Sequence, residues 1–378
     1  MNKKHGKAAS FLAALLMTAA LPLSSQTGAW LTAPLTVSAE EESYTEGETG
    51  DLYYQKYSDH IVISGCNTSA SSIVIPDTIE GLPVTKIDTN VGGFSEMKTL
   101  TLPDTLTEIG AYAFNWCSNL ESVTFPDSLQ MIDFQAFEHC TALKTVNFPD
   151  HLVKTGSYTL DETPWLDAQR QKDPLVVVNG CLVDARTAKG EVKVPAGVKY
   201  VAGGAFSKNN DVTSVVFPSS VTAMGDNVFW YCENLTSAEL GGVTYLDWGS
   251  FGACNKLKTL KLSGKLTEIN SGAFTDNEGT STITFCGTED TWNKVVKDPD
   301  DAYLKRATII FDPNGGDPEP VAGDINQDGS CDLTDVKLLR DWLTAVPNTV
   351  LADWKAGDMN NDGKLTASDL TLLKRSLL

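Results

Sequence analysis

Short apolar segments of alternating polarity recur through the middle of the chain. In a representative segment, Val123 and Phe125 are apolar, Ser122 and Thr124 are polar, and Pro126 follows. Alternation with a period of two residues predicts a short β-strand that buries one face. The proline ends the strand, because it has no N–H group to donate to a sheet ladder.

The segment repeats with a period close to 23 residues. Two sets of anchors recur in phase, namely prolines after the strand and phenylalanines 11 residues later. The prolines are Pro103, Pro126, Pro149, Pro195 and Pro218, and the phenylalanines are Phe114, Phe137, Phe206 and Phe229. Units of this length cannot bury their apolar side alone, and they stack into solenoids. We therefore predict a β-rich solenoid with one coil per repeat.

The repeat resembles the BspA-like class of leucine-rich repeats. That class has the pattern Ile-Gly-x-x-Ala-Phe followed by a cysteine, which residues 109–114 and Cys117 match. The resemblance implies a leucine-rich repeat solenoid, which we place over 40–311. The ends of a stacked solenoid must be covered, so we expect a hairpin cap over 52–66 and a closing unit over 283–311.

One unit departs from the repeat, over residues 157–194. Within it, the apolar run from Val176 to Val183 is interrupted by Asn179-Gly180. Asn-Gly is favoured in two-residue hairpin turns, so this run predicts a β-hairpin.

Four cysteines occupy one position of the repeat. Cys117, Cys140, Cys232 and Cys254 each lie three residues after a phenylalanine. In neighbouring coils such side chains lie about 4.8 Å apart with parallel Cα–Cβ vectors. A disulfide needs converging Cβ atoms at about 3.8 Å. We therefore expect buried thiols that pack as small apolar groups.

Polar strand residues between the core positions predict a hydroxyl-rich sheet with few charges. Candidate ligand-binding residues on it are Ser122, Thr124, Thr145, Asn147, Ser214, Glu239 and Lys261. Two interpretations stay open: serine and threonine suit any exposed strand face, and continuous solenoid faces are common binding platforms. Three aromatic residues near the bend of the coil leave a similar choice between packing at the coil edge and stacking on sugars. These are Trp116, Trp230 and Tyr231.

Two loops near the C-terminus carry oxygen side chains at matching positions. They begin at Asp324 and Asp358, and each has a glycine at its sixth position, Gly329 or Gly363. A calcium ion needs six to eight oxygen ligands, and the glycine permits the tight bend that turns them inward. The pattern predicts two Ca²⁺ ions, with Ser330 and Lys364 contributing only backbone carbonyls. The ligands are Asp324, Asn326, Asp328, Ser330, Asp332 and Asp335 in the first loop, and Asp358, Asn360, Asp362, Lys364, Thr366 and Asp369 in the second.

These loops differ from an ordinary EF-hand, since position 12 is aspartate in both and the Pro- and Gly-rich segment 312–320 excludes a helix before the first. They resemble a type I dockerin, a small all-α calcium-binding module with two F-hand motifs. The resemblance implies binding to a cohesin domain of a scaffoldin in a cellulosome. The implied contacts are Leu333, Thr334, Arg340, Asp341, Ala367, Ser368, Lys374 and Arg375. Because the two copies differ in size and charge, we expect one preferred orientation, led by the second copy.

The N-terminus has the pattern of a secretory signal peptide. Lysines at positions 3, 4 and 7 precede an apolar run over 8–23, and Val37-Ser38-Ala39 offers a cleavage site. We therefore divide the chain into a signal peptide (1–39), a solenoid (40–311), a linker (312–320) and a dockerin-like module (321–378). No later stretch is apolar enough to span a membrane, and the net charge of −20 argues against nucleic acid as a partner.

No motif of a known catalytic class is found along the chain. The sequence predicts a secreted, extracellular and non-catalytic cellulosome component that serves polysaccharide degradation. Its solenoid then recognises a ligand, with a plant cell-wall glycan or a protein as the candidates. Two alternatives stay open. One is a carbohydrate-active or proteolytic enzyme with a site on the solenoid surface, and the other is a structural or adhesin protein.

Overall fold

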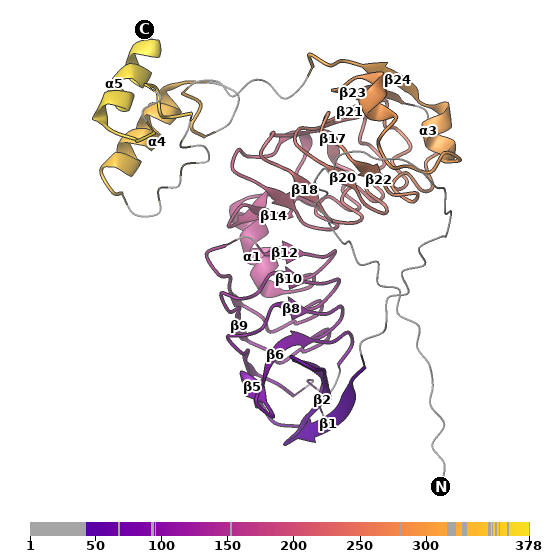
Figure 1. Ribbon diagram of the computed structural model, residues 1–378, viewed down its shortest axis with the longest axis vertical. Coiled ribbons are helices and arrows are strands. Elements are labelled where there is room, and N and C mark those ends of the chain that lie inside the picture. The colour runs from indigo at the N-terminus through magenta and orange to yellow at the C-terminus, as the bar shows by residue number, and fades with distance from the viewer. Residues whose placement is uncertain are drawn as a thin grey trace, which may run out of the picture. The chain divides into compact units, whose positions relative to one another are not determined.

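The computed structural model describes residues 43–66, 69–91, 94, 96–151, 153–279 and 281–315, and in the C-terminal part 323–326, 331–346, 349, 351, 354, 356–360 and 363–377. The predicted signal peptide (1–39) lies outside the described residues, as do most of the predicted linker and the candidate ligands Asp328, Ser330 and Asp362. Figure 1 shows stacked coils in the repeat part and the helices α4 (Leu333–Leu343) and α5 (Ala367–Ser376) in the C-terminal part.

A hairpin covers the start of the solenoid. Its antiparallel strands are β1 (Thr45–Thr49), β2 (Leu52–Lys56) and β3 (Ile61–Cys66). β3 then pairs in parallel with β6 (Leu82–Ile87) of the first coil. The hairpin lies where a cap over 52–66 was predicted, and β1 adds an edge strand to it.

The first half of the solenoid stacks parallel strands on two faces. One face continues the sheet of the cap beyond β6, with the short β5 (Thr78–Ile79) beside it, through β8 (Glu108–Ile109), β10 (Met131–Ile132) and β12 (Lys154–Thr155). The other face is a separate sheet of four strands, in the order β11 (Thr145–Asn147), β9 (Ser122–Thr124), β7 (Thr99–Thr101) and β4 (Ser72–Val74).

The second half repeats this plan. One face begins with the predicted hairpin of β13 (Val176–Val178) and β14 (Cys181–Asp184). The same sheet continues through β16 (Tyr200–Val201) and β18 (Ala223–Met224). A separate two-stranded sheet follows, of β20 (Tyr245–Leu246) and β22 (Glu268–Ile269). The other face is a six-stranded sheet of β15 (Gly190–Lys193), β17 (Val212–Phe217), β19 (Ser237–Leu240), β21 (Thr259–Leu262), β23 (Thr282–Phe285) and β24 (Thr308–Phe311).

Three helices interrupt the coils. α1 (Pro164–Lys172) lies in the atypical unit between the two halves, and no helix was predicted there from the sequence. α2 (Glu289–Trp292) and α3 (Ala302–Arg306) belong to the closing unit, where Trp292 is buried and β24 ends the sheet. These elements lie within the range 283–311 that was predicted as the closing unit.

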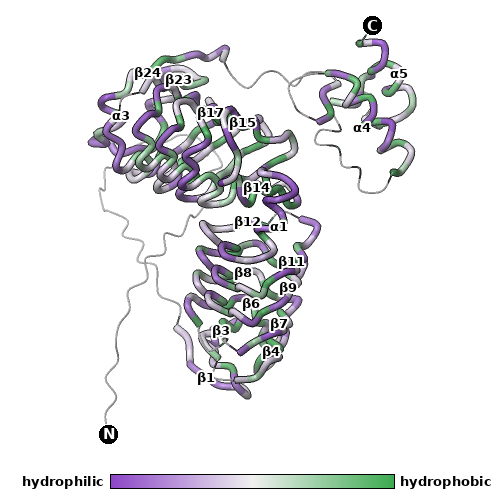
Figure 2. Tube along the Cα trace, turned by 180° about the vertical axis from the view of Figure 1, so that it is seen from behind, coloured by the Kyte–Doolittle hydropathy of each residue, from purple (hydrophilic) through white to green (hydrophobic). Residues whose placement is uncertain are grey.

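Stacked phenylalanine rings fill the interior of the coils. The ring centroids of Phe114 and Phe137 lie 5.0 Å apart, and those of Phe229 and Phe251 lie 5.1 Å apart. Apolar and polar segments alternate along each coil (Figure 2). Buried apolar residues form two main clusters, one from Leu52 to Val176 and one from Leu182 to Tyr303. The solenoid therefore has two cores that meet at the atypical unit.

The cysteines of the repeat are buried free thiols, as expected. In three of the four, Sγ donates to the carbonyl oxygen of a phenylalanine in the preceding coil. The three pairs are Cys140 to Phe114 at 3.2 Å, Cys232 to Phe206 at 3.0 Å and Cys254 to Phe229 at 2.9 Å. Burial raises the pKa of Cys232 to about 12. Each of these carbonyls also accepts a backbone N–H of its own bend, so the thiol adds a second hydrogen bond that links neighbouring coils.

The C-terminal part holds α4 (Leu333–Leu343) and α5 (Ala367–Ser376), each starting with a capping box. The two helices pack around a small separate core of Ile325, Val336, Leu339 and Leu373. This arrangement confirms the small all-α module that was predicted after the solenoid.

Candidate functional site

The hydroxyl-rich surface of the first half lies on β7, β9 and β11. The parallel register places Thr145 beside Ser122 and Asn147 beside Thr124, and all four are exposed. Asn147 Nδ2 donates to Thr124 Oγ1 at 3.1 Å across the two strands. The surface therefore offers hydroxyl and amide groups in fixed rows without a charge among them.

The matching surface of the second half lies on β17, β19 and β21. Ser237 Oγ donates to Ser214 Oγ at 2.8 Å, and Lys261 Nζ lies 3.9 Å from Glu239 Oε2. The register pairs these residues side by side. This platform thus carries an ion pair as well as hydroxyl groups, and its candidate residues are half-buried or exposed.

The two surfaces belong to different sheets, which corrects the prediction of one continuous face. β11 is the last strand of its sheet and β15 is the first strand of the next. Between them in the sequence come α1 and the β13–β14 hairpin. Ser122, Thr124, Thr145 and Asn147 therefore form one candidate platform, and Ser214, Glu239 and Lys261 belong to another.

The three aromatic candidates differ in exposure. Trp116 is 63% exposed and Tyr231 is 42% exposed, whereas Trp230 is half-buried. The indole of Trp230 stacks on Trp248, with ring centroids 5.0 Å apart. Trp248 was not among the predicted residues, although it lies three residues before the buried Phe251, as Phe134 does before Phe137.

Asp335, at position 12 of the first loop, organises the backbone of that loop. Its side chain is fully buried. Its Oδ1 accepts hydrogen bonds from the backbone N–H groups of Ile325 at 2.8 Å and Asn326 at 3.0 Å, and its Oδ2 accepts from Asp332 at 2.9 Å. The backbone of the first loop is therefore held by hydrogen bonds to a buried carboxylate, without a cation.

Asp369, the equivalent residue of the second loop, has one oxygen without a partner among the described residues. Its Oδ2 accepts from the backbone N–H and the hydroxyl of Thr366, but its buried Oδ1 accepts no hydrogen bond from this part of the chain. Burial alone would raise the pKa of Asp369, and the polar groups of Thr366 together with the backbone of Asn360 outweigh it and lower the pKa. A buried, ionised and unsatisfied oxygen at position 12 fits a calcium ligand.

Other described loop residues also suit a cation site. Gly363 has a φ of 78°, and its N–H donates to Asp358 Oδ2 at 2.8 Å. Within the described residues, no three His, Cys, Asp or Glu side chains gather as a metal site. Asp328, Ser330 and Asp362 fall outside that part of the chain, so the complete ligand set stays a prediction.

Comparison with protein families follows the same division of the chain. A model of the BspA type leucine rich repeat region matches in six copies, over residues 64–169 and 186–295. The chain belongs to the BspA type leucine rich repeat family. A second model, the dockerin type I domain, matches residues 322–378. Both resemblances drawn from the sequence are therefore confirmed.

Solved leucine-rich repeat structures also match the chain. A leucine rich cell surface protein from Faecalibacterium prausnitzii is 18% identical, with 68% of this chain and 99% of that chain covered and a TM-score of 0.29. A leucine rich repeat protein of T. pallidum is 24% identical over 64% and 83%, with a TM-score of 0.26. The pneumococcal vaccine antigen PcpA is 15% identical over 71% and 98%, with a TM-score of 0.31. The comparison with curated proteins gave no match.

The candidate cohesin contacts of the dockerin domain lie at the surface. Leu333 is 77% exposed, and all the others except the half-buried Asp341 are exposed. Arg340 donates from Nε at 2.8 Å and from Nη2 at 2.6 Å to Asp341 Oδ1. Lys374 and Arg375 form no ion pair with another described residue. The first copy therefore presents a neutralised pair, and the second presents two positive charges.

None of the described helices is long and apolar enough to cross a membrane.

Proposed function

We propose that this chain is a secreted, non-catalytic component of a cellulosome-type complex. Its dockerin domain binds a cohesin domain of a scaffoldin, and its leucine-rich repeat region recognises a protein or glycan ligand outside the cell. The observation that carries this proposal is the dockerin match over 322–378 together with the unsatisfied Asp369 oxygen. Both matched families are of non-catalytic domains, which favours a binding role over an enzymatic one.

Two calcium ions complete the dockerin domain in this proposal. The described residues that would hold them are Asp324, Asn326, Asp332 and Asp335 in the first loop, and Asp358, Asn360, Lys364, Thr366 and Asp369 in the second. When bound, each Ca²⁺ neutralises the gathered carboxylates and ties its loop to the following helix. Metal binding is then coupled to the folding of this small core.

The test is retention of the full chain on an immobilised type I cohesin domain. We expect binding in calcium and loss of binding in excess EGTA. Asp369→Asn should weaken binding strongly, because it removes a charged ligand and keeps the size of the side chain. Lys364→Ala is the matched control, since only its backbone carbonyl is assigned to the ion. Binding that survives the chelator would contradict the proposal.

We also propose that the dockerin domain has one preferred orientation, led by its second copy. The positive charges of Lys374 and Arg375 can meet an acidic cohesin face, whereas Asp341 offsets Arg340. Replacing Lys374 and Arg375 together by alanine should weaken cohesin binding about tenfold or more, and replacing Leu333 and Arg340 should have a smaller effect. Equal losses from the two double variants would contradict a single orientation.

In this proposal, the repeat region binds its ligand on the hydroxyl platform, which consists of Ser122 and Thr124 on β9 and Thr145 and Asn147 on β11. Three lysines in place of Thr124, Thr145 and Asn147 would crowd and charge this surface without entering the core, since all three side chains are exposed. We expect that the triple variant folds and loses binding to a wall glycan or protein that the unaltered chain retains. Unchanged binding to every such ligand would exclude this platform.

A further inference from the structure

A separate corner of the solenoid combines exposed aromatic rings with a strip of amide and carboxylate groups. It lies where the coil bends after the buried phenylalanines Phe114 and Phe137. We call it the aromatic corner, and it consists of Tyr112, Asn115, Trp116, Gln135, Glu138 and His139. Its two coils are joined by backbone bonds, from Trp116 N–H to the carbonyl of Glu138 at 2.9 Å and from Tyr112 N–H to that of Phe134 at 2.9 Å.

The fold does not require a tryptophan at position 116. Its backbone is left-handed, with a φ of 63°, a conformation that costs free energy for most side chains. The equivalent bends of other coils hold Lys208, Ala253 and Asp276 in the same conformation. The indole is nevertheless 63% exposed, so its apolar surface does not serve the core. A large exposed ring at a strained position points to a ligand.

The indole is held as a rigid platform. His139 stacks on it, with ring centroids 4.0 Å apart and an interplanar angle of 24°. Because the imidazole covers one face, the large exposed fraction includes the opposite face. Tyr112 is 39% exposed and is fixed edge-on against Phe134, with ring centroids 5.3 Å apart. Preorganised rings lose little freedom when a ligand stacks on them.

Hydrogen-bonding groups lie beside these rings in a fixed arrangement. Glu138 Oε2 accepts from Asn115 Nδ2 at 3.1 Å and from Gln135 Nε2 at 2.5 Å. Burial and then the charge of Glu138 raise the pKa of Tyr112. Glu138 Oε1 accepts no bond from the described residues, and it remains available for a ligand hydroxyl.

We propose that the aromatic corner binds a neutral glycan, with one hexopyranose ring stacked on Trp116 and its hydroxyl groups bonded to Glu138 and Asn115. A sugar ring has an apolar face of C–H groups and a rim of hydroxyl groups, and the corner offers a partner for each. The carboxylate and the chain's net charge of −20 disfavour acidic sugars.

This inference rests on the proposed role of the repeat region in ligand recognition, and it names the ligand class and a second place for it. The glycan would lie at the bend of the coil and not on the hydroxyl platform. The two sites are separable by mutation, because Trp116 is not on a strand and Thr124, Thr145 and Asn147 are.

Isothermal titration of the full chain with cellohexaose and mannohexaose tests the proposal, with an oligogalacturonide as the acidic comparison. We expect binding of at least one neutral oligosaccharide and none of the acidic one. Trp116→Asn should weaken binding about tenfold or more, and it should fold normally because asparagine tolerates a left-handed backbone. Glu138→Gln should weaken binding less. Val296→Ala, at an equally exposed side chain of 63%, is the control that should change nothing.

Oxidation by N-bromosuccinimide locates the bound sugar independently. Trp116 should be protected by the oligosaccharide, whereas Trp248 and Trp342, which are 46% and 43% exposed, should not. The inference is overturned if no neutral oligosaccharide binds, if Trp116→Asn binds as well as the unaltered chain, or if Trp116 is unprotected. Loss of sugar binding in the triple lysine variant alone would leave ligand recognition standing and exclude this corner.

Discussion

Asp226 is a partly buried carboxylate at a bend of the second half. Ser157 Oγ donates to its Oδ1 at 3.0 Å and Asn227 Nδ2 donates to its Oδ2 at 2.6 Å. Burial nevertheless raises the pKa of Asp226 above the ordinary value. The unfolded carboxyl group therefore ionises at a lower pH than the folded one, and ionised Asp226 opposes folding.

The consequence is a pH-dependent effect of Asp226→Asn. The contribution of Asp226 is fully present below the unfolded pKa and is lost as the pH rises through the folded pKa. Relative to the unaltered chain, the variant should therefore gain stability as the pH rises above the ordinary pKa of aspartic acid, about 3.9. Urea unfolding of the solenoid at several pH values measures this difference. Asp127→Asn, at an exposed carboxylate, is the control, and a relative stability of Asp226→Asn that does not change with pH would refute the argument.

The residues at the start of α1 are typical of a helix N-terminus, although no helix was predicted there. Thr163 precedes Pro164, and this is a common beginning of a helix. In the structure, Thr163 Oγ1 accepts from the backbone N–H of Leu166 at 3.3 Å and donates to the carbonyl of Leu160 at 2.7 Å. Thr163→Ala should lower the free energy of unfolding by about 1 kcal/mol. Urea denaturation checks this, with the exposed Lys172→Ala as a control that should change little.

The strands and their buried faces were predictable from the sequence. Whether a strand residue is buried or exposed follows from alternation with its immediate neighbours in the sequence. Val123 is buried and Thr124 is exposed, as alternation requires. The break between β11 and β15 was not predictable, since it depends on how the unit over 157–194 routes the chain. The stacking of Trp230 on Trp248 joins neighbouring coils and has no local pattern. In the dockerin domain, spacing predicted the loops, but only packing reveals the unsatisfied oxygen of Asp369.

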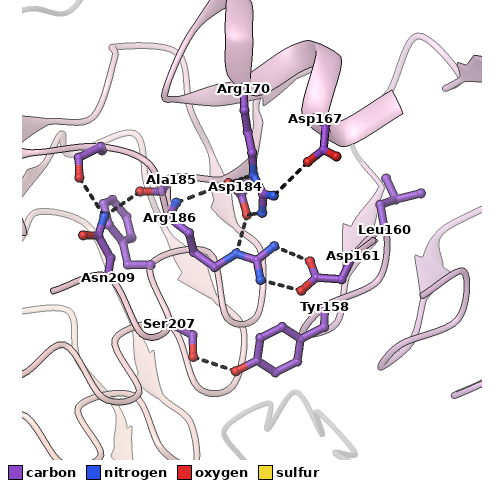
Figure 3. Close-up of polar contacts among 12 residues, drawn as sticks. Tyr158, Leu160, Asp161, Asp167, Arg170, Asp184, Ala185, Arg186, Ser207 and Asn209 are labelled. Atoms are coloured by element: carbon purple, nitrogen blue, oxygen red, sulfur yellow. Dashed lines mark hydrogen bonds and ion pairs between the residues drawn. The ribbon is translucent and has the colours of Figure 1, made fainter. Parts of the chain in front are cut away.

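At the scale of the whole solenoid, a charged network joins the two cores (Figure 3). Asp184 accepts from Arg170 Nε at 2.9 Å and Nη2 at 2.8 Å, and from Arg186 Nε at 2.6 Å. Arg186 also bonds to Asp161 through both Nη atoms. Arg170 and Asp161 come from the side of the first core, and Asp184 and Arg186 come from the side of the second. The pairs Arg170–Asp184 and Arg186–Asp161 therefore cross the junction, whereas the pair Arg186–Asp184 lies on the side of the second core.

Removing Asp184 should uncouple the two cores. Its side chain is 2% exposed, so Asp184→Ala leaves Arg170 with only Asp167, at 3.4 Å. Breaking a buried pair in this way costs about 3–5 kcal/mol. Because the loss falls at the junction, we expect Asp184→Ala to unfold in two urea transitions and the unaltered chain to unfold in one. Asp167→Ala removes an exposed partner of the same arginine and should change the stability by less than about 1 kcal/mol. A single transition displaced no further than in this control would mean that the apolar stacking alone joins the cores.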